Sequence, residues 1–155
     1  MNLPDSMIVT RVYEATPEQV WAAFTDPDQI HKFFGPKGTH VPRESVSIDL
    51  RVGGEFKLSM TRDDADGSEP APMMNAEFTI VEPPNRFQLL TSRGGHITIE
   101  IQDLELEGRT LVTWSTKGDY EKLGQEFYSG SVIGTHMTMD QLGEYLAGVL
   151  EVSHS

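Results

Sequence analysis

The sequence predicts an α+β fold in which a curved antiparallel sheet wraps around a long C-terminal helix. Three observations support this prediction. Two short helix signals lie near the start of the chain, within residues 16–34. Between residues 46 and 117, apolar residues recur at every second position, which is the period of a half-buried strand. The last segment, residues 121–155, returns to helical spacing.

The chain begins with a predicted strand and a capped helix. Residues 7–13 are rich in β-branched side chains and predict a strand. Thr16 is a suitable helix N-cap, since Pro17 takes the first helical position and Gln19 follows the cap by three residues. We therefore expect a first helix to begin at residue 17.

Two further segments show helical signals. Asp26-Pro27 repeats the start signal, and Gly35-Pro36 is expected to end this second helix. In the last segment Ser129-Gly130-Ser131 lowers helix propensity, so the helix either begins or kinks there. The apolar side of the second helix is expected to comprise Ile30, Phe33 and Phe34. The last helix is expected to carry an apolar stripe made of Tyr128, Val132, Thr135, Met139, Leu142, Leu146 and Val149.

The central part of the chain predicts antiparallel strands with one apolar and one polar face. Glycine- and proline-rich turns separate the strands, as at Gly53-Gly54. Such strands form a sheet that is covered on one face only. The residues expected on the apolar face are Val46, Ile48, Leu50, Phe56, Leu58, Met60, Ala76, Phe78, Ile80, Ile97, Ile99 and Ile101.

A single long helix does not always fill the curve of such a sheet, so we expect an internal apolar cavity. A fully packed core is the alternative. If the cavity is present, it should hold a ligand of about ten heavy atoms, since ligand pockets are concave and mainly apolar. The residues expected to line it are Phe34, Phe56, Met60, Phe78, Ile97, Ile99, Trp114, Phe127, Tyr128, Val132, Thr135 and Met139.

Length, charge and cysteine content restrict the classes of function. The 155 residues fit one domain over residues 1–155, and the absence of cysteine excludes disulfides and thiolate metal sites. A formal net charge of -12 argues against nucleic acid as a partner and favours a neutral or cationic ligand. No signal peptide or membrane-spanning run is present in the sequence, so we expect a cytoplasmic protein without membrane insertion.

The sequence predicts no catalytic residue, metal site or cofactor. No histidine pair has the spacing of a zinc site. His136 and Asp140 are four residues apart on the last helix, where they can share a hydrogen bond or a metal, or remain solvated. Tyr128 and Thr135 are polar groups on an apolar stripe, which either orient a ligand or bond to backbone or water.

Several phrases of this sequence resemble the activator of heat shock protein 90 ATPase homologue-like family. That family belongs to the START-like, Bet-v-1-like helix-grip superfamily, also called SRPBCC, and the resemblance implies the order β-α-α-β6-α, with six strands between the second and third helices. The phrases are Ala15 to Trp21, Thr25 to Pro27, Phe33 to Pro36, Asp49 to Phe56 and Val81 to Phe87.

The chain departs from the family pattern at two places. Phe33 and Phe34 stand where the family often has two tryptophans, and Gly134-Thr135 where it often has Gly-Trp. The smaller Thr135 implies either a wider cavity or a different ligand. Superfamily members bind lipids, sterols and polyketides, and some are cyclases or hydrolases, so a fold-level resemblance defines no single activity.

Three functions are therefore expected, in order of preference. The first is non-enzymatic binding of a small hydrophobic molecule by a monomer or homodimer. The second is a cyclase or hydrolase in the same cavity, for which Glu126, Tyr128 and His136 are the nearest titratable groups. The third is a protein-interaction or chaperone-modulating module, which would need a contiguous exposed apolar patch. From its length of 155 residues, we expect this chain to lack the additional N-terminal domain of the family's co-chaperones.

Overall fold

A computed structural model describes residues 3–69, 71–106 and 108–153 of the chain, with the backbone alone for residues 149–153. The elements, in chain order, are β1 (Ser6–Tyr13), α1 (Pro17–Thr25), α2 (Pro27–Ile30), β2 (Thr39–His40), the 3-10 helix η1 (Arg43–Ser45), β3 (Ser47–Ile48), β4 (Glu55–Ser59), β5 (Thr61–Arg62), β6 (Met73–Glu82), β7 (Arg86–Thr91), β8 (His96–Asp103), β9 (Thr110–Lys117), α3 (Tyr120–Leu123) and α4 (Gln125–Ser153).

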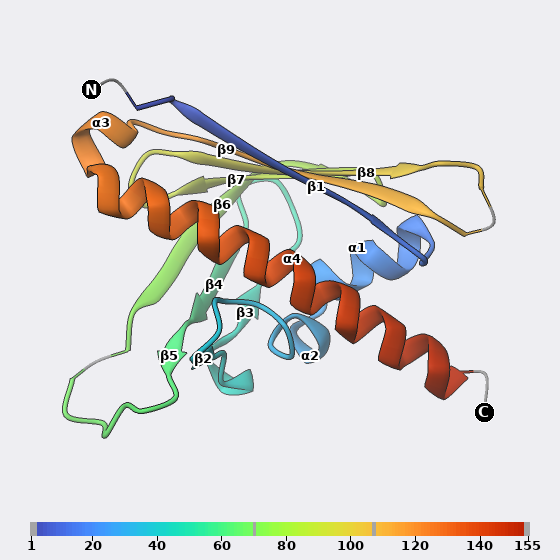
Figure 1. Cartoon of the computed structure of the whole chain (residues 1–155), viewed down its shortest axis with the longest axis horizontal. Helices are drawn as coiled ribbons and strands as arrows, with labels where there is room; N and C mark the ends of the chain where they lie inside the picture. Colours follow the sequence, from blue (N-terminus) through green and yellow to red (C-terminus); the bar gives the residue numbers. More distant parts are fainter. Residues whose placement is uncertain (1–2, 70, 107, 154–155) are drawn as a thin grey trace.

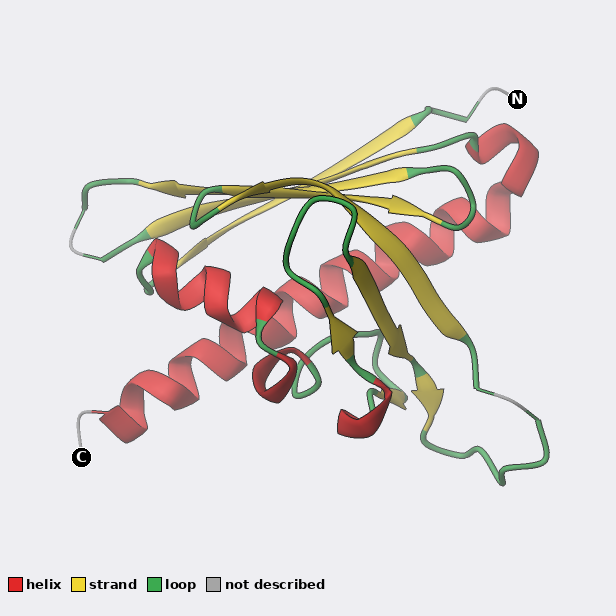
Figure 2. Cartoon of the chain, turned by 180° about the vertical axis from the view of Figure 1, so that it is seen from behind, coloured by secondary structure: helices red, strands yellow, loops and turns green. Residues whose placement is uncertain are grey.

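Seven strands form an antiparallel sheet in the order β1-β9-β8-β7-β6-β4-β3, and β2 pairs with β5 in a separate ribbon. Figure 1 shows α4 crossing one face of the sheet, with α1 and α2 beside it on the same face. In Figure 2, β6, β4 and β3 bend away from the other four strands toward the helices. The predicted α+β, helix-grip architecture is confirmed.

A β-bulge in β6 changes which side chains face the helices. Phe78 lies opposite Leu89, but Ile80 lies opposite Gln88 and Val81 opposite Phe87. Val81 packs against the core after the bulge. The prediction that Ile80 shares the apolar face with Phe78 is therefore wrong, because one extra residue in a strand turns every later side chain to the opposite face.

The predicted cap of α1 is confirmed, whereas the predicted end of the second helix is wrong. The Thr16 hydroxyl accepts from the Gln19 N–H at 3.2 Å, and Gln19 Oε1 accepts from the Thr16 N–H at 2.8 Å. Helix α2 ends at Ile30 rather than at Gly35. Side chains of α4 bond the backbone of the following turn: the Thr138 hydroxyl accepts from the Gly35 N–H at 3.2 Å, and Gln141 Nε2 donates to the Phe33 carbonyl oxygen at 2.7 Å.

Helix α4 runs without a break from Gln125 to Ser153, through the segment where the sequence suggested a start or a kink. Along its predicted stripe, Tyr128 and Val132 are half-buried. The stripe residues that are buried are Thr135, Met139, Leu142 and Leu146, and the side chain of Val149 lies outside the described residues.

The predicted turn at Gly53-Gly54 forms between β3 and β4. Gly53 has a φ of 85°, and a Cβ on Gly54 would overlap the carbonyl oxygen of Asp49. Both positions therefore favour glycine. Leu50 lies in this loop and is 39% exposed, so its predicted place on the apolar face of a strand is wrong.

Aromatic rings fill much of the space between the sheet and the helices. The Phe87 ring, on β7, makes edge contacts with three other rings. Its partners are Trp21 at 5.7 Å, Phe24 at 6.0 Å and Phe78 at 5.9 Å between ring centroids. Such edge-on pairs add to the stability that burial alone provides.

Among the described residues, no helix is long and apolar enough to cross a bilayer.

Candidate functional site

A small apolar cavity lies between the sheet and the segment that contains α1 and the turn after α2. Its volume is about 10 Å³, which is room for about one water molecule. Ligand pockets usually measure roughly 300–1,000 Å³. This interior cavity therefore does not offer the ready-made space for about ten heavy atoms that the sequence predicted. The residues lining the cavity are Phe24, Phe34, Phe56, Met74, Phe87, Leu89, Ile97, Ile99 and Trp114.

The cavity is small because aromatic rings from the N-terminal helices occupy the curve of the sheet. Phe34 stacks on Trp114 with ring centroids 5.9 Å apart, and Phe24 meets the same indole edge-on at 6.1 Å. From the sequence, the last helix was expected to leave part of this curve unfilled, with Phe34 among the residues lining the space. In the structure, the turn after α2 supplies a second aromatic wall.

The cavity brings together five of the predicted lining residues, namely Phe34, Phe56, Ile97, Ile99 and Trp114. It also has four lining residues that sequence reasoning missed, namely Phe24, Met74, Phe87 and Leu89. The signals for these four are present in the sequence. Phe24 belongs to the helical spacing of α1, and the other three lie on the period-two faces of β6 and β7.

The other predicted residues do not line this cavity. Phe78, Thr135 and Met139 are buried, and Thr135 donates to the Ser131 carbonyl oxygen at 2.7 Å within α4. The half-buried ones are Met60 after β4 and Phe127, Tyr128 and Val132 on α4. Three of these half-buried side chains thus cluster at the beginning of α4, next to the sheet.

The second half of α4, residues 135–148, is held by hydrogen bonds from three other segments. The Tyr13 hydroxyl donates to the Met139 carbonyl oxygen at 2.7 Å. Gln141 Nε2 donates to the carbonyl oxygens of Phe33 at 2.7 Å and Gly35 at 2.8 Å. At the far end, the Tyr145 hydroxyl donates to Gln29 Oε1 at 3.0 Å. These bonds fix the second half of the helix against β1, α2 and the turn that follows it.

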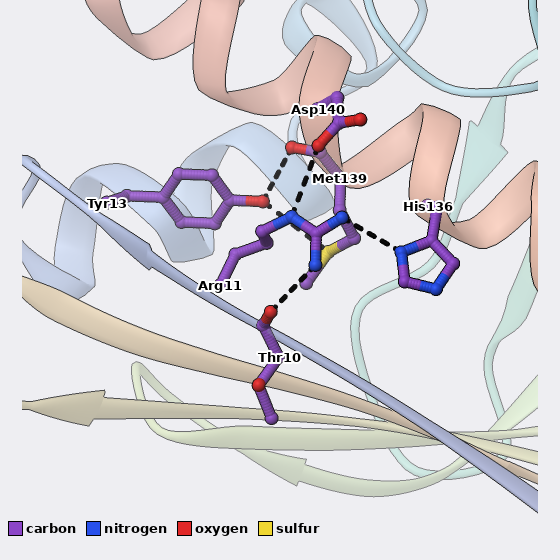
Figure 3. Close-up of polar contacts among 6 residues, drawn as sticks. All are labelled: Thr10, Arg11, Tyr13, His136, Met139 and Asp140. Atoms are coloured by element: carbon purple, nitrogen blue, oxygen red, sulfur yellow. Dashed lines mark hydrogen bonds and ion pairs between the residues drawn. The ribbon is translucent and has the colours of Figure 1, made fainter.

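Arg11 on β1 extends this attachment at the surface, as Figure 3 shows. Its Nε donates to Asp140 Oδ1 at 3.2 Å, and Nη2 lies 2.9 Å from His136 Nδ1. A third nitrogen, Nη1, donates to the Thr10 carbonyl oxygen at 2.9 Å. His136 and Asp140, which the sequence suggested could bond to each other or share a metal, are instead both bonded to one guanidinium group.

The first half of α4, residues 125–134, has a different set of contacts. Gln125 Nε2 donates to Ser129 Oγ at 3.0 Å, a bond within the helix itself. Contacts from outside involve rings and apolar packing. Arg93 of the β7–β8 turn lies 4.9 Å from the Phe127 ring centroid, the Tyr120 ring lies 5.0 Å from that of Tyr128, and Val132 packs against the core. Gly130 has open space around its α-carbon. Among the described residues, side-chain hydrogen bonds to other segments therefore hold the second half of α4, whereas ring and apolar contacts hold the first.

The described residues give little support for acid–base chemistry inside the fold. Glu126 and His136 are exposed, and Tyr128 is half-buried. Among the described residues, no cluster of three or more histidine and acidic side chains could hold a metal ion.

A second, open groove of about 320 Å³ is lined by Ser6, Ile8, Gln88, His96, Thr98, Ser115, Thr116 and Lys117, most of them on the face of the sheet opposite α4.

The fold and its interior define a helix-grip protein with an apolar interior between sheet and helix. A family model described as "Activator of Hsp90 ATPase homolog 1-like protein" matches residues 14–147. The chain therefore belongs to this family, as the phrases in its sequence suggested. A search of curated proteins found no significant sequence match.

Solved bacterial structures share this architecture. A protein from Rhodobacter sphaeroides matches with a TM-score of 0.78 and 18% identity, over 93% of each chain. Protein Ms6760 from Mycobacterium smegmatis matches with a TM-score of 0.78 and 22% identity, over 94% of this chain and 92% of that one. An AHSA1-like protein from Aeromonas hydrophila matches with a TM-score of 0.73 and 22% identity, over 92% and 94%. At these identities the likeness shows the fold alone.

Proposed function

We propose that this protein is a single-domain, non-enzymatic binder of a small, mainly apolar molecule. The molecule is taken up between the sheet and the first half of α4. The observation that carries this proposal is the contrast between the two halves of α4. The second half is fixed by hydrogen bonds through Tyr13, Gln141 and Tyr145. The half-buried side chains of the first half, namely Phe127, Tyr128 and Val132, instead meet aromatic and apolar neighbours.

Uptake requires the first half of α4 to move, because the apolar cavity beside α1 and the turn after α2 holds about one water molecule and has no α4 residue in its lining. The sequence of this half favours such movement. Gly130 and Gly134 lower its helix propensity relative to alanine. Met60 and Met74 lie on the sheet side, and the flexible methionine side chain adapts to differently shaped partners.

Because only the open form binds the ligand, the apparent affinity is the affinity of the open form multiplied by the fraction of the protein that is open. A ligand then shifts the population toward the open form by binding it more tightly. The apolar lining selects for molecules with little charge, since burying an unpaired charge is strongly unfavourable. Binding is favoured over catalysis because Glu126 and His136 lie at the surface. The cytoplasmic location and the monomeric or dimeric state stay predictions.

Amide hydrogen exchange tests the proposal directly. The probe is 6-propionyl-2-dimethylaminonaphthalene, a small apolar ketone whose emission reports the polarity around it. Without probe, amides of residues 125–134 should exchange faster than those of residues 139–146, because their part of the helix opens more readily. With saturating probe, exchange should slow over residues 125–134. Protection confined to the outer groove around His96 and Thr98 would contradict the proposal.

A matched pair of substitutions on α4 locates the site. Val132 is half-buried, and Ile133 beside it is 55% exposed. Val132→Trp should fill the proposed space and weaken probe binding by about tenfold or more, which corresponds to about 1.4 kcal/mol. Ile133→Trp should leave the affinity unchanged. Equal effects of the two substitutions would place binding elsewhere.

Native mass spectrometry of the purified wild-type protein should show a co-purified small molecule.

A further inference from the structure

Tyr120 presents a buried hydroxyl that the fold does not use. The residue opens α3, directly after β9, and its side chain is 2% exposed. Among the described residues, its hydroxyl oxygen is the buried side-chain polar atom that has no hydrogen-bond partner. Buried tyrosine hydroxyls usually have a partner, because an unsatisfied polar group destabilises the folded state. A phenylalanine would satisfy packing at this position equally well.

The neighbours of Tyr120 place it beside the proposed binding region. Its ring meets the Tyr128 ring edge-on, with centroids 5.0 Å apart, and lies 6.3 Å from the Phe127 ring. Both partners are half-buried and belong to the first half of α4. A movement of this half that admits a ligand would therefore uncover the Tyr120 side chain.

Thr116 connects Tyr120 to the wall of the apolar cavity. Trp114 Nε1 donates to Thr116 Oγ1 at 3.2 Å, and Thr116 lies opposite Ile97 in the β8–β9 pair. Trp114 and Ile97 both line the cavity. Thr116 is near enough to affect the Tyr120 hydroxyl, but the two hydroxyl groups lack the geometry of a hydrogen bond.

The Tyr120 hydroxyl is a hydrogen-bond donor at neutral pH. Burial raises the pKa of this hydroxyl above its ordinary value of 10.0, Tyr128 raises it further, and Thr116 opposes the shift. The group therefore keeps its proton and can donate it to an acceptor. The rings of Phe127 and Tyr128 pack against the Tyr120 ring, and the protein carries a net charge of -12, so a neutral acceptor suits the place better than a carboxylate.

We propose that the Tyr120 hydroxyl is the polar anchor of the binding site and donates a hydrogen bond to a neutral carbonyl oxygen of the ligand. The ligand class is then an apolar molecule with a ketone, ester or amide group, rather than a hydrocarbon or a carboxylic acid. This inference rests on the proposed function, since it requires a molecule between the sheet and the first half of α4.

Three matched probes and one substitution test the anchor. The probes are 6-propionyl-2-dimethylaminonaphthalene, the carbonyl-free 2-dimethylaminonaphthalene and the carboxylate 6-dimethylamino-2-naphthoate. Their affinities are measured for the wild-type protein, Tyr120→Phe and the control Tyr145→Phe. The control also loses a tyrosine hydroxyl, but one that bonds to Gln29 at the other end of α4. Urea unfolding of each variant reports its stability.

We expect Tyr120→Phe to weaken binding of the ketone by about three- to tenfold, the range expected for one hydrogen bond. It should leave the affinity for the carbonyl-free probe unchanged and should not lower stability. The ketone should bind the wild-type protein more tightly than the carboxylate does. Tyr145→Phe should bind all probes as the wild-type protein does.

The outcomes separate the two proposals. If the ketone and the carbonyl-free probe both bind the wild-type protein and Tyr120→Phe weakens neither, the anchor is wrong and the proposed function stands. If the carboxylate binds most tightly, the ligand class is wrong. If no probe binds the wild-type protein, the proposed function fails and the anchor fails with it. A loss of stability in Tyr120→Phe would show that the hydroxyl has a structural role instead.

Discussion

The buried hydroxyl of Tyr13 donates a hydrogen bond of 2.7 Å to the backbone carbonyl oxygen of Met139, as Figure 3 shows. This bond joins the edge strand β1 to the middle of α4. One turn further along the helix, Gly143 leaves room for the ring, since a Cβ there would lie 3.3 Å from Tyr13 Cε1. The pair therefore sets how closely α4 approaches the sheet and fixes the second half of the helix.

Removing the Tyr13 hydroxyl should lower the stability of the protein. Tyr13→Phe deletes a buried hydrogen bond and keeps the ring, so we expect a loss of about 0.5–1.5 kcal/mol in the free energy of unfolding. Urea denaturation followed by circular dichroism measures this quantity. Tyr120→Phe is the control, because its hydroxyl has no partner among the described residues. Equal stability of wild-type protein and Tyr13→Phe would contradict the role of this bond.

Two glycines of α4 should respond differently to alanine. Gly130 has nothing within 4 Å of an added Cβ. Gly130→Ala should therefore stabilise the protein by about 0.8–1.0 kcal/mol, the difference in helix propensity. Gly143→Ala should gain less or lose stability, because the Tyr13 ring has to shift. Thermal unfolding compares them, and an equal gain from both substitutions would refute the close contact with Tyr13.

The stability of the protein should decline in strongly alkaline solution. Burial, the largest cause, raises the pKa of Tyr13 well above its ordinary value of 10.0, although the charge of Arg11 opposes the shift. Above pH 10.0, the unfolded chain loses the tyrosine proton while the folded protein keeps it. The contribution of Tyr13 is therefore complete below that pH and is lost as the pH rises through the folded-state pKa. Urea titrations between neutral and alkaline pH should show a steeper decline for the wild-type protein than for Tyr13→Phe.

Enlarging the apolar cavity should create a site for a small hydrocarbon. Leu89 lines the cavity and is 2% exposed. Leu89→Ala should lose about 2–5 kcal/mol of stability through the new space, and benzene should restore part of this loss by occupying it. Leu90→Ala, on the opposite face of β7, is the control. A benzene effect of the same size in both variants would mean that the benzene binds outside the cavity.

The ion pair between Arg11 and Asp140 should contribute little to stability. The two side chains are 31% and 63% exposed, respectively, and exposed pairs contribute about 0.2–1 kcal/mol. Asp140→Asn should therefore cost less than Tyr13→Phe, and its effect should shrink in high salt because mobile ions screen exposed charges. A large loss that is insensitive to salt would show that Asp140 has a further structural role.

Local signals in the sequence predict much of this fold correctly. The cap at Thr16 depends on residues within one helical turn, so neighbours in the chain suffice to specify it. The one-faced strands follow from the alternation of apolar residues, as in Ile97, Ile99 and Ile101 of β8. The family phrases fall in the same places as these elements, which is why the sequence predicts the architecture.

The incorrect predictions depend on contacts between distant parts of the chain. The bulge that turns Ile80 outward arises in the pairing of β6 with β7, and strand pairing leaves no mark in the local alternation. The second helix ends at Ile30, and the turn that follows is bonded by Gln141, which lies more than one hundred positions away in the chain. Tyr120 was missed because the period of its neighbours is neither that of a strand nor that of a long helix.

The sequence by itself determined the α+β class, the family and the face that most strands turn to the core, since these follow from residue types and their spacing. The tertiary structure alone decided the size of the interior cavity and the unequal attachment of the two halves of α4. Both depend on how side chains from separate elements fill a common space, as Phe34 does against Trp114. Packing of this kind is set by shape in three dimensions, which the spacing of apolar residues along a chain does not specify.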